Sequence, residues 1–328
     1  MTVTTEILAR TTPVYEIESA IETYQLSKIY RTGFWLNRKV ESLKECTLQV
    51  EQGETFGLLG LNGAGKTTLL KTLLGIVKPT AGKGLLLGKP LGDRSVKQKI
   101  GYLPENPYFY DFLTGWELLE YTAGLFEIPR SIQKQRIPAL LDLVGLAQSA
   151  AKKKQLRQYS KGMVQRVGMA QALINDPKLV FLDEPMSGLD PLGRKQMREI
   201  IISLGDRGKT VFFNSHVLAE VEQICNRVGI LAQGELICCG TMSELLTDKD
   251  RYYYVSGRGG NPDVLDRWMN NITYHDDIWS GKMQGEPQEF MATLRLLDAE
   301  LISLNRGRAS LEEFFMEQME LRGIRSSS

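Results

Sequence analysis

A glycine-rich segment carries the clearest chemical signal in this chain. Residues 60–68 read GLNGAGKTT, which fits the pattern G-x-x-x-x-G-K-[ST]. In that pattern the glycines let backbone N–H groups close around phosphate oxygens, the lysine meets the terminal phosphates, and a hydroxyl reaches Mg²⁺. The segment therefore predicts a triphosphate site with a metal ion at Thr67. Its expected phosphate ligands are Gly60, Asn62, Gly63, Ala64, Gly65, Lys66, Thr67 and Thr68.

The residues on either side of this loop supply the elements that it needs. Thr55–Leu59 is a short apolar run typical of a strand buried in a parallel sheet, and apolar residues recur at helical spacing from Lys66 onward. A helix N-terminus carries about half a positive charge and unsatisfied N–H groups, so an anion placed there is stabilised. This order of strand, loop and helix favours a phosphate site over the alternative, an ordinary glycine-rich turn.

A second apolar run ends on two carboxylates. Lys178–Leu182 predicts a buried strand, and Asp183 and Glu184 follow at its carboxyl end, the edge at which open α/β sheets bind ligands. Asp183 is expected to hold Mg²⁺ directly or through water, because this hard cation takes oxygen ligands. Glu184 can orient and deprotonate an attacking water. The alternative is a strand that ends in a solvated acidic turn, which the phosphate loop in the same chain disfavours.

The segment before this strand resembles the signature sequence of the ATPase subunits of ATP-binding cassette (ABC) transporters. The family usually has LSGGQ, and Tyr159–Met163 reads YSKGM, which keeps the serine and the second glycine but has Lys161 in place of the first glycine. Ser160 stands where a helix is expected to begin, so its hydroxyl, the N–H of Gly162 and the helix dipole can face a γ-phosphate. Without the family, Ser160 is explained as an ordinary helix N-cap.

Two further segments match the family in its usual order. Ser187–Asp190 matches the loop that lies across the dimer interface in this family, which places Asp190 among the nucleotide-binding residues. The expected strand Thr210–Ser215 leads to His216, which matches the histidine that contacts the γ-phosphate and the attacking water. The chain has two histidines, and the other, His275, has no such context and is expected at the surface.

The adenine base is expected to stack on an aromatic ring near the start of the chain. Leu26–Tyr30 matches the family's position for this ring, and a flat purine suits an aromatic face. Tyr30 is therefore the expected residue. Because the segment after it is longer than the family's usual turn, Phe34 or Trp35 is the alternative.

One position departs from the family. Residues 101–105 read GYLPE, so Glu105 stands where the family commonly has a glutamine that contacts Mg²⁺ and senses the membrane subunit. A carboxylate can still take the metal or a water, although it adds negative charge near the phosphates. The GYLPE form resembles cassettes that serve drug, lipid, ion or polysaccharide export more than those of nutrient importers, and so favours export.

Aromatic residues cluster directly after this loop, where the family contacts a membrane permease. Exposed apolar surface there would form the groove in which a permease helix docks. The alternative is that the rings form the core of a helical insert, since most aromatic residues are buried for packing. The residues concerned are Tyr108, Phe109, Tyr110, Phe112 and Trp116.

The resemblance implies both a fold class and an activity. The expected fold is α/β, a P-loop NTPase with a RecA-like core sheet, an antiparallel β subdomain, an α-helical subdomain and a small α+β C-terminal domain. The implied function is ATP hydrolysis coupled to transport, with ATP and Mg²⁺ as cofactors and a separate transmembrane permease as partner. Two cassettes, as a homodimer or a heterodimer with a related ATPase, would sandwich two ATP molecules, each between one chain's phosphate loop and the other's signature.

Changes of pattern along the chain predict its domains. Residues 1–19 are polar and expected to be loose, and residues 20–246 are expected to form the cassette, with a mostly helical insert at about 107–173. Alternating strands and helices predict a parallel sheet, with an antiparallel piece at its start. Residues 247–328 are expected to form the small α+β domain.

Three signals support that C-terminal domain. Arg251–Val255 predicts a strand, Gly257–Pro262 a turn, and Ser310–Glu313 the capping box of a last helix. A further helix is expected between them. Its predicted apolar face is Phe290, Leu294, Leu297 and Leu301.

Composition agrees with an ATPase subunit that has no membrane span. The 328 residues favour two domains, 42% hydrophobic residues suffice for a sizeable core, and a net charge of +1 gives no argument for nucleic-acid binding. No apolar stretch approaches the roughly 20 residues of a membrane span, and Met1–Ala20 lacks the layout of a signal peptide. We therefore expect a cytoplasmic chain, held peripherally on the inner face of the membrane by the permease. Free thiols without metal-ligand spacing are expected at Cys46, Cys225, Cys238 and Cys239.

Two other classes of function are the alternatives. A cassette ATPase that acts on DNA or ribosomes would carry a long coiled coil or two cassettes in one chain, and the sequence predicts neither. A regulatory subunit that binds ATP without hydrolysing it is disfavoured, because the chain keeps all the expected catalytic groups. These groups are Lys66, Asp183, Glu184 and His216.

Overall fold

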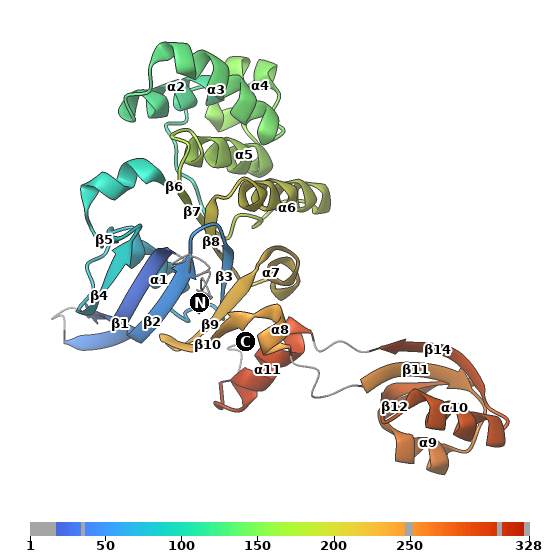
Figure 1. Cartoon of the computed structure of the whole chain (residues 1–328). Coiled ribbons are helices and arrows are strands. Elements are labelled where there is room, and N and C mark those ends of the chain that lie inside the picture. The colour runs from blue at the N-terminus through green and yellow to red at the C-terminus, as the bar shows by residue number, and fades with distance from the viewer. Residues whose placement is uncertain (1–17, 34–36, 247–251, 307–309, 325–328) are drawn as a thin grey trace, which may run out of the picture.

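The computed structural model describes residues 18–33, 37–246, 252–306 and 310–324, and these residues form three β-sheets with helices around them (Figure 1). One sheet is mainly parallel and the other two are antiparallel. The predicted α/β fold class is thus confirmed. Most of the N-terminal segment 1–19, and Arg251 at the start of a predicted strand, lie outside the described residues.

The central sheet consists of β3 (Thr55–Leu59), β6 (Ile100–Leu103), β7 (Leu179–Asp183), β8 (Thr210–Ser215), β9 (Arg227–Ala232) and β10 (Glu235–Thr241). Its order is β10-β9-β3-β8-β7-β6, and β10 is the strand that runs antiparallel to its neighbour. Every residue of β3, β7 and β8 is buried, which explains their mainly apolar sequences. Because β8 lies between β3 and β7, the ends of these three strands meet at one edge.

The second sheet is antiparallel and packs against the helix that follows the glycine-rich loop. It consists of β1 (Ser19–Thr32), β2 (Arg38–Glu51), β4 (Ala81–Leu86) and β5 (Lys89–Pro90), in the order β2-β1-β4-β5. Its buried residues share a hydrophobic cluster with α1 (Lys66–Leu73) and with β3. The 3-10 helix η1 (Arg94–Lys99) then leads into β6.

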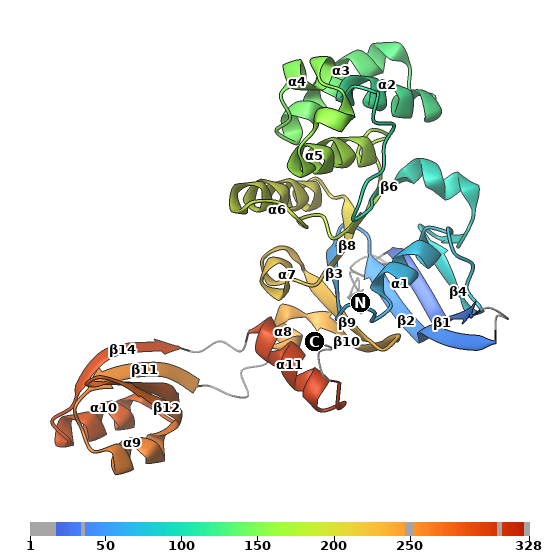
Figure 2. The same ribbon diagram turned by 180° about the vertical axis from the view of Figure 1, so that it is seen from behind.

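Four helices gather at one end of the molecule (Figure 2). They are α2 (Gly115–Leu125), α3 (Arg130–Leu143), α4 (Gln148–Lys153) and α5 (Lys161–Ala172), with the 3-10 helix η2 (Leu156–Gln158) before the last. A capping box begins α2, because the Thr114 hydroxyl accepts from the Glu117 N–H and the Glu117 carboxylate accepts from the Thr114 N–H. All four helices fall within the segment predicted as a helical insert.

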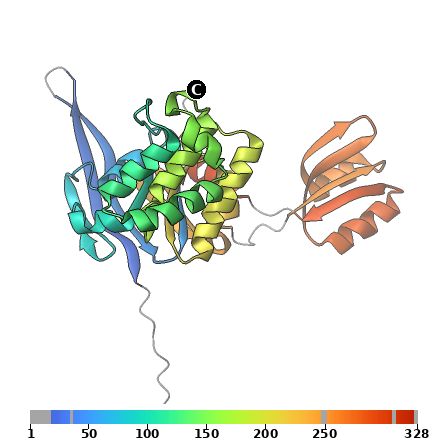
Figure 3. The same ribbon diagram turned by 90° about the horizontal axis from the view of Figure 1, so that it is seen from above.

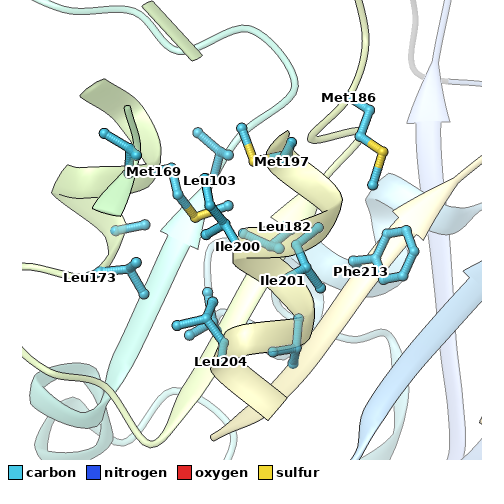
Figure 4. Close-up of a cluster of buried hydrophobic side chains, with 14 of the residues drawn as sticks. Leu103, Met169, Leu173, Leu182, Met186, Met197, Ile200, Ile201, Leu204 and Phe213 are labelled. Carbon is cyan, nitrogen blue, oxygen red and sulfur yellow. The ribbon is translucent and has the colours of Figure 1, made fainter. Parts of the chain in front are cut away.

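Helix α6 (Pro191–Asp206) packs between the central sheet and this group of helices. Its buried residues Met197, Ile200, Ile201 and Leu204 recur at helical spacing and form one apolar face. Figure 4 shows that face between the sheet and α5. The surrounding side chains are Leu103, Met169, Leu173, Leu182, Met186 and Phe213.

The third sheet lies in the C-terminal part of the chain (Figure 3, orange). Its elements are β11 (Tyr252–Arg258), α9 (Pro262–Trp268), β12 (Met269–His275), β13 (Ile278–Gln284), α10 (Pro287–Leu296) and β14 (Glu300–Arg306). The strand order is β12-β13-β11-β14, and every pair is antiparallel. This is the split β-α-β arrangement, with both helices in one hydrophobic cluster with the sheet.

Two predictions for this region were wrong. Gly257, expected in a turn, lies within β11, where a Cβ atom would stand 2.2 Å from Cζ2 of Trp279. The strand needs glycine there because the indole ring crosses its backbone. Leu301, expected on a helix face, lies in β14, since α10 ends at Leu296.

The last helix, α11 (Leu311–Glu320), leaves the third sheet and returns to the cassette. Its buried residues Leu311, Phe315 and Met319 belong to the same hydrophobic cluster as the central sheet. Its neighbours are α7 (Leu218–Ile224) and α8 (Met242–Leu245). In the structure, therefore, the segment predicted as one C-terminal domain is divided between the third sheet and the cassette.

The N-terminus of α11 also touches the third sheet. The predicted capping box is confirmed, because the Ser310 hydroxyl accepts from the Glu313 N–H at 3.1 Å. The Glu313 carboxylate accepts from the Lys282 ammonium at 2.8 Å and from the Tyr254 hydroxyl at 3.3 Å. Glu313 thus links α11 to the third sheet.

Within the described ranges, no helix is both long enough and apolar enough to cross a membrane. The cysteines are free, and two of them, Cys46 and Cys225, are buried. Burial raises the pKa of Cys46 to about 12, so this residue packs as a small apolar thiol.

Candidate active site

The glycine-rich loop joins β3 to α1 and is held closely by two neighbouring strands. A Cβ atom on Gly60 would lie 2.3 Å from the Leu231 carbonyl oxygen, and one on Gly65 would lie 2.4 Å from the Ser42 carbonyl oxygen. Gly65 also has φ 108°, a backbone conformation that favours glycine. The glycines of the pattern are therefore needed for the loop's shape as well as for its phosphate contacts.

Lys66 is buried inside this loop. Its ammonium donates to the Gly60 carbonyl at 2.6 Å and to the Leu61 carbonyl at 3.3 Å. Burial lowers the pKa of Lys66, while the nearby carboxylates Glu184 and Asp183 act in the opposite direction. A cation is thus held where the phosphates are expected.

One pocket of about 270 Å³ brings the predicted catalytic groups together. The phosphate loop forms one wall of it, and the carboxyl ends of β6, β7 and β8 supply the acidic and histidine side chains. Its lining residues are Ser42, Leu61, Asn62, Gly63, Ala64, Gly65, Lys66, Thr67, Thr68, Glu105, Asp183, Glu184 and His216. Residues far apart in the sequence meet here because the carboxyl ends of parallel strands share one edge.

Asp183 is buried at the end of β7 and is oriented by the next strand. Its Oδ1 accepts a hydrogen bond of 3.0 Å from Nδ2 of Asn214, which is fully buried in β8. Burial raises the pKa of Asp183, and the hydrogen bond from Asn214 opposes that shift. Among the described residues, Oδ1 of Asn214 has no hydrogen-bond partner.

Glu184 and His216 form a pair at the mouth of the pocket. Oε2 of Glu184 lies 2.8 Å from Nδ1 of His216. Burial raises the pKa of Glu184, whereas the neighbouring His216 and Lys66 lower it. Glu184 also has φ 49°, in the left-handed region that is costly for residues other than glycine. Such strain is common at active sites, and Glu184 lines the pocket.

The oxygen atoms of the pocket suit a hard divalent cation. Thr67, Glu105 and Asp183 line it together, and they offer one hydroxyl and two carboxylates. Mg²⁺ prefers such oxygen ligands and is usually bound through one or two carboxylates and substrate phosphates. The predicted metal residues therefore fit Mg²⁺.

Other predicted nucleotide residues do not line this pocket. Ser160 caps α5 by accepting from the Met163 N–H at 3.3 Å, and Asp190 caps α6 by accepting from the Gly193 N–H at 2.9 Å. Gly162 lies in the first turn of α5, and Tyr30 lies in β1 with the Lys28 ammonium 5.0 Å from its ring centre. Phe34 and Trp35, the alternatives to Tyr30, lie outside the described residues.

Two polar side chains of the site were not found from the sequence. Asn214 had a weak signal, since it is a polar residue within an otherwise apolar strand. Ser42 had none, because only folding brings its hydroxyl within 2.8 Å of the Thr68 hydroxyl.

Comparisons with known proteins identify relatives of this arrangement. The sequence model of the family described as ABC transporter matches residues 43–187. An ABC transporter ATP-binding protein of Nostoc sp. is 63% identical over 303 residues, which cover 92% of this chain and 90% of the relative. A bacitracin transport ATP-binding protein of Bacillus licheniformis is 39% identical over 224 residues, or 67% of this chain and 69% of the relative.

A solved structure shows the same similarity in three dimensions. It is the dimeric structure of a bacterial ABC transporter cassette, with a TM-score of 0.62 and 25% sequence identity. The match covers 68% of this chain and 98% of the solved chain.

Proposed function

The chain belongs to the ABC transporter family as an ATP-binding, ATP-hydrolysing subunit, and from this premise we propose that it drives export through a separate transmembrane permease. One observation carries the proposal. A single pocket joins the phosphate loop to the other expected catalytic groups, Asp183, Glu184 and His216. These groups are what ATP hydrolysis requires.

The phosphate loop and Lys66 are proposed to hold the β- and γ-phosphates. The Lys66 ammonium now donates to carbonyl oxygens, and phosphate oxygens would replace these acceptors when ATP enters. The N-terminus of α1 adds its partial positive charge. Thr67, Asp183 and Glu105 would hold Mg²⁺, which neutralises charge on the phosphates when it is bound.

Glu184 is proposed as the general base that accepts a proton from the attacking water. Its burial raises its pKa, which makes the carboxylate a stronger base. His216, 2.8 Å away, fixes the orientation of the carboxylate and is itself half-exposed at the pocket mouth. His216 is therefore placed to meet a γ-phosphate as well.

Ser160, Gly162 and Asp190 are proposed to act on ATP held by a second cassette. Within one chain they begin α5 and α6 and lie outside the pocket. A head-to-tail dimer would bring them to the other chain's nucleotide, and a dimeric cassette of similar fold supports this arrangement. Tyr30 is proposed to stack on the adenine of its own chain's ATP.

The permease is proposed to dock on the exposed rings that follow Glu105. Tyr108 is 97% exposed, Tyr110 59% and Phe112 60%. Phe109 and Trp116 instead pack against the hydrophobic core, so the docking proposal is confined to the exposed rings. Docking there would place the chain on the cytoplasmic face of a membrane.

Export of a drug-type cargo is the finer proposal. It is supported by the GYLPE sequence at Glu105 and by the similarity to a bacitracin transport subunit. Inside-out vesicles carrying the chain and its co-purified permease should accumulate labelled bacitracin when ATP is added. Import would appear instead as ATP-driven uptake by right-side-out vesicles with ATP sealed inside.

Glu184→Gln tests the catalytic part of the proposal. This variant should still bind ATP, lose about two to four orders of magnitude in turnover, and accumulate an ATP-bound dimer in sedimentation experiments. Glu222→Gln, an exposed change on α7, is the matched control and should behave like the parent. A Glu184→Gln chain that stays monomeric at all concentrations and hydrolyses ATP normally would contradict both the base and the sandwich.

A further inference from the structure

Lys161 is the residue by which the signature departs from the family's usual sequence. It is the first residue of α5 and stands between Ser160, which caps the helix, and Gly162. Its side chain is exposed. A glycine at this position would offer a backbone N–H alone, whereas lysine adds a positive charge to the same surface.

The Lys161 side chain lies along the loop between β7 and α6. A Cβ atom on Gly188 would stand 2.6 Å from Cδ, 2.5 Å from Cε and 2.3 Å from Nζ of Lys161. Gly188 has φ +70°, and its missing side chain leaves the space that the lysine occupies. Lys161 therefore packs the start of α5 against the loop Ser187–Asp190. In the proposed function, both segments face the second cassette.

The charge of Lys161 is not balanced within the described part of the chain. Its ammonium has no hydrogen bond or ion pair there, and the first turn of α5 contains no acidic residue. A cation near a helix N-terminus is also disfavoured by the helix dipole. Contact with an anion from outside the chain would remove both disadvantages.

We infer that Lys161 binds the γ-phosphate of the ATP held by the second cassette. The inference rests on the proposed dimer, in which Ser160 and Gly162 already face that phosphate. The ammonium would form a charge-assisted hydrogen bond to a phosphate oxygen. Because the aliphatic stem already packs over Gly188, the side chain loses less conformational entropy when the ammonium binds the phosphate.

The test compares variants that separate charge from packing, all in the Glu184→Gln chain. Lys161→Met keeps the stem over Gly188 and removes the charge, whereas Lys161→Arg keeps both. Lys195→Met, an exposed lysine on α6, is the control for loss of one positive charge. Sedimentation at increasing ATP concentration measures dimer formation, and titration of dilute monomer with ATP measures binding to a single chain.

Lys161→Met should need about tenfold more ATP for half-maximal dimer formation, the low end for a hydrogen bond to a charged group. Lys161→Arg and Lys195→Met should match the parent. ATP binding by the monomer should be the same in all variants, because Lys161 acts on the partner's nucleotide.

Several results would overturn the inference. If Lys161→Met and the parent form the dimer at the same ATP concentration, Lys161 does not bind the phosphate. A similar defect and a lower melting temperature in both Lys161→Met and Lys161→Arg would assign the residue to packing over Gly188. A defect that persists without nucleotide would show that the ammonium meets a carboxylate of the second chain instead. If the parent itself forms no dimer with ATP, the sandwich fails, and Lys161 loses its role with it.

Discussion

Asn214 offers a sharp test of how the site is organised, because it touches Asp183 without lining the pocket. Its Nδ2 donates to Oδ1 of Asp183 at 3.0 Å, and its own Oδ1 is buried without a partner among the described residues. Asn214→Leu keeps a side chain of similar size and removes both polar atoms. The change should therefore separate the orientation of Asp183 from the stability of the fold.

Two opposing contributions set the change in unfolding free energy for Asn214→Leu. Loss of the hydrogen bond to the Asp183 carboxylate costs about 1.5–3 kcal/mol, whereas removal of an unsatisfied buried oxygen relieves about 1–3 kcal/mol. The net change should stay within about 2 kcal/mol. Activity has no such compensation, since loss of a group that orients a metal ligand typically costs about 10–100-fold in metal affinity or turnover.

The assay measures ATP turnover as a function of Mg²⁺ concentration, with thermal melting of each variant alongside. Asn175→Leu is a matched control, because Nδ2 of Asn175 donates to backbone carbonyls near the start of β6 and its buried Oδ1 also has no partner in the part of the chain that the structure describes. The control should change stability and leave the Mg²⁺ dependence intact. If folded Asn214→Leu keeps the parent's turnover and half-saturating Mg²⁺ concentration, Asn214 does not orient Asp183.

Three further changes probe other parts of the molecule. Lys66→Ala should lose tight ATP binding in calorimetry, because it removes the ammonium from the phosphate loop, and binding like the parent's would place the site elsewhere. Glu105→Gln should remain folded and active but respond differently to the permease in ATPase assays; a sharp fall in melting temperature at constant activity per folded molecule would make it a structural residue. Phe315→Ala should destabilise the cassette by about 3–5 kcal/mol in denaturant unfolding, since the ring is buried against it, whereas exposed Met316→Ala should cost at most about 0.5 kcal/mol. Equal small losses in these two variants would show that α11 is not part of the cassette core.

The pocket could be predicted largely because its parts are encoded locally. The phosphate loop needs a strand before it and a helix after it, and both have clear patterns over a few residues around Lys66. Asp183, Glu184 and His216 follow other apolar strands directly. Since strand ends of a parallel sheet meet at one edge, these short segments were enough to bring the same residues together.

The remaining features depend on long-range pairing, which a single sequence does not encode locally. Asn214 reaches Asp183 because β8 is inserted between β3 and β7, and Ser42 reaches the loop because β2 passes behind it. In the third sheet, Gly257 stays in a strand because of Trp279, which is far away in sequence. The start of α11 was predicted from its capping box, but a capping box does not identify the surface that the helix covers.

The path of the chain through its C-terminal part has a practical consequence. Tyr253 near the start of β11 pairs with Arg306 at the end of β14, so the chain enters and leaves the third sheet at adjoining positions. Such a unit is organised like a domain inserted into a host, and not like a terminal appendage. A protein cut after residue 246 would lack α11 and expose the apolar surface of α7 and α8, which favours aggregation. Replacing only residues 252–306 with a short linker would instead leave the host cassette whole, and would be the sound way to ask what the inserted domain contributes.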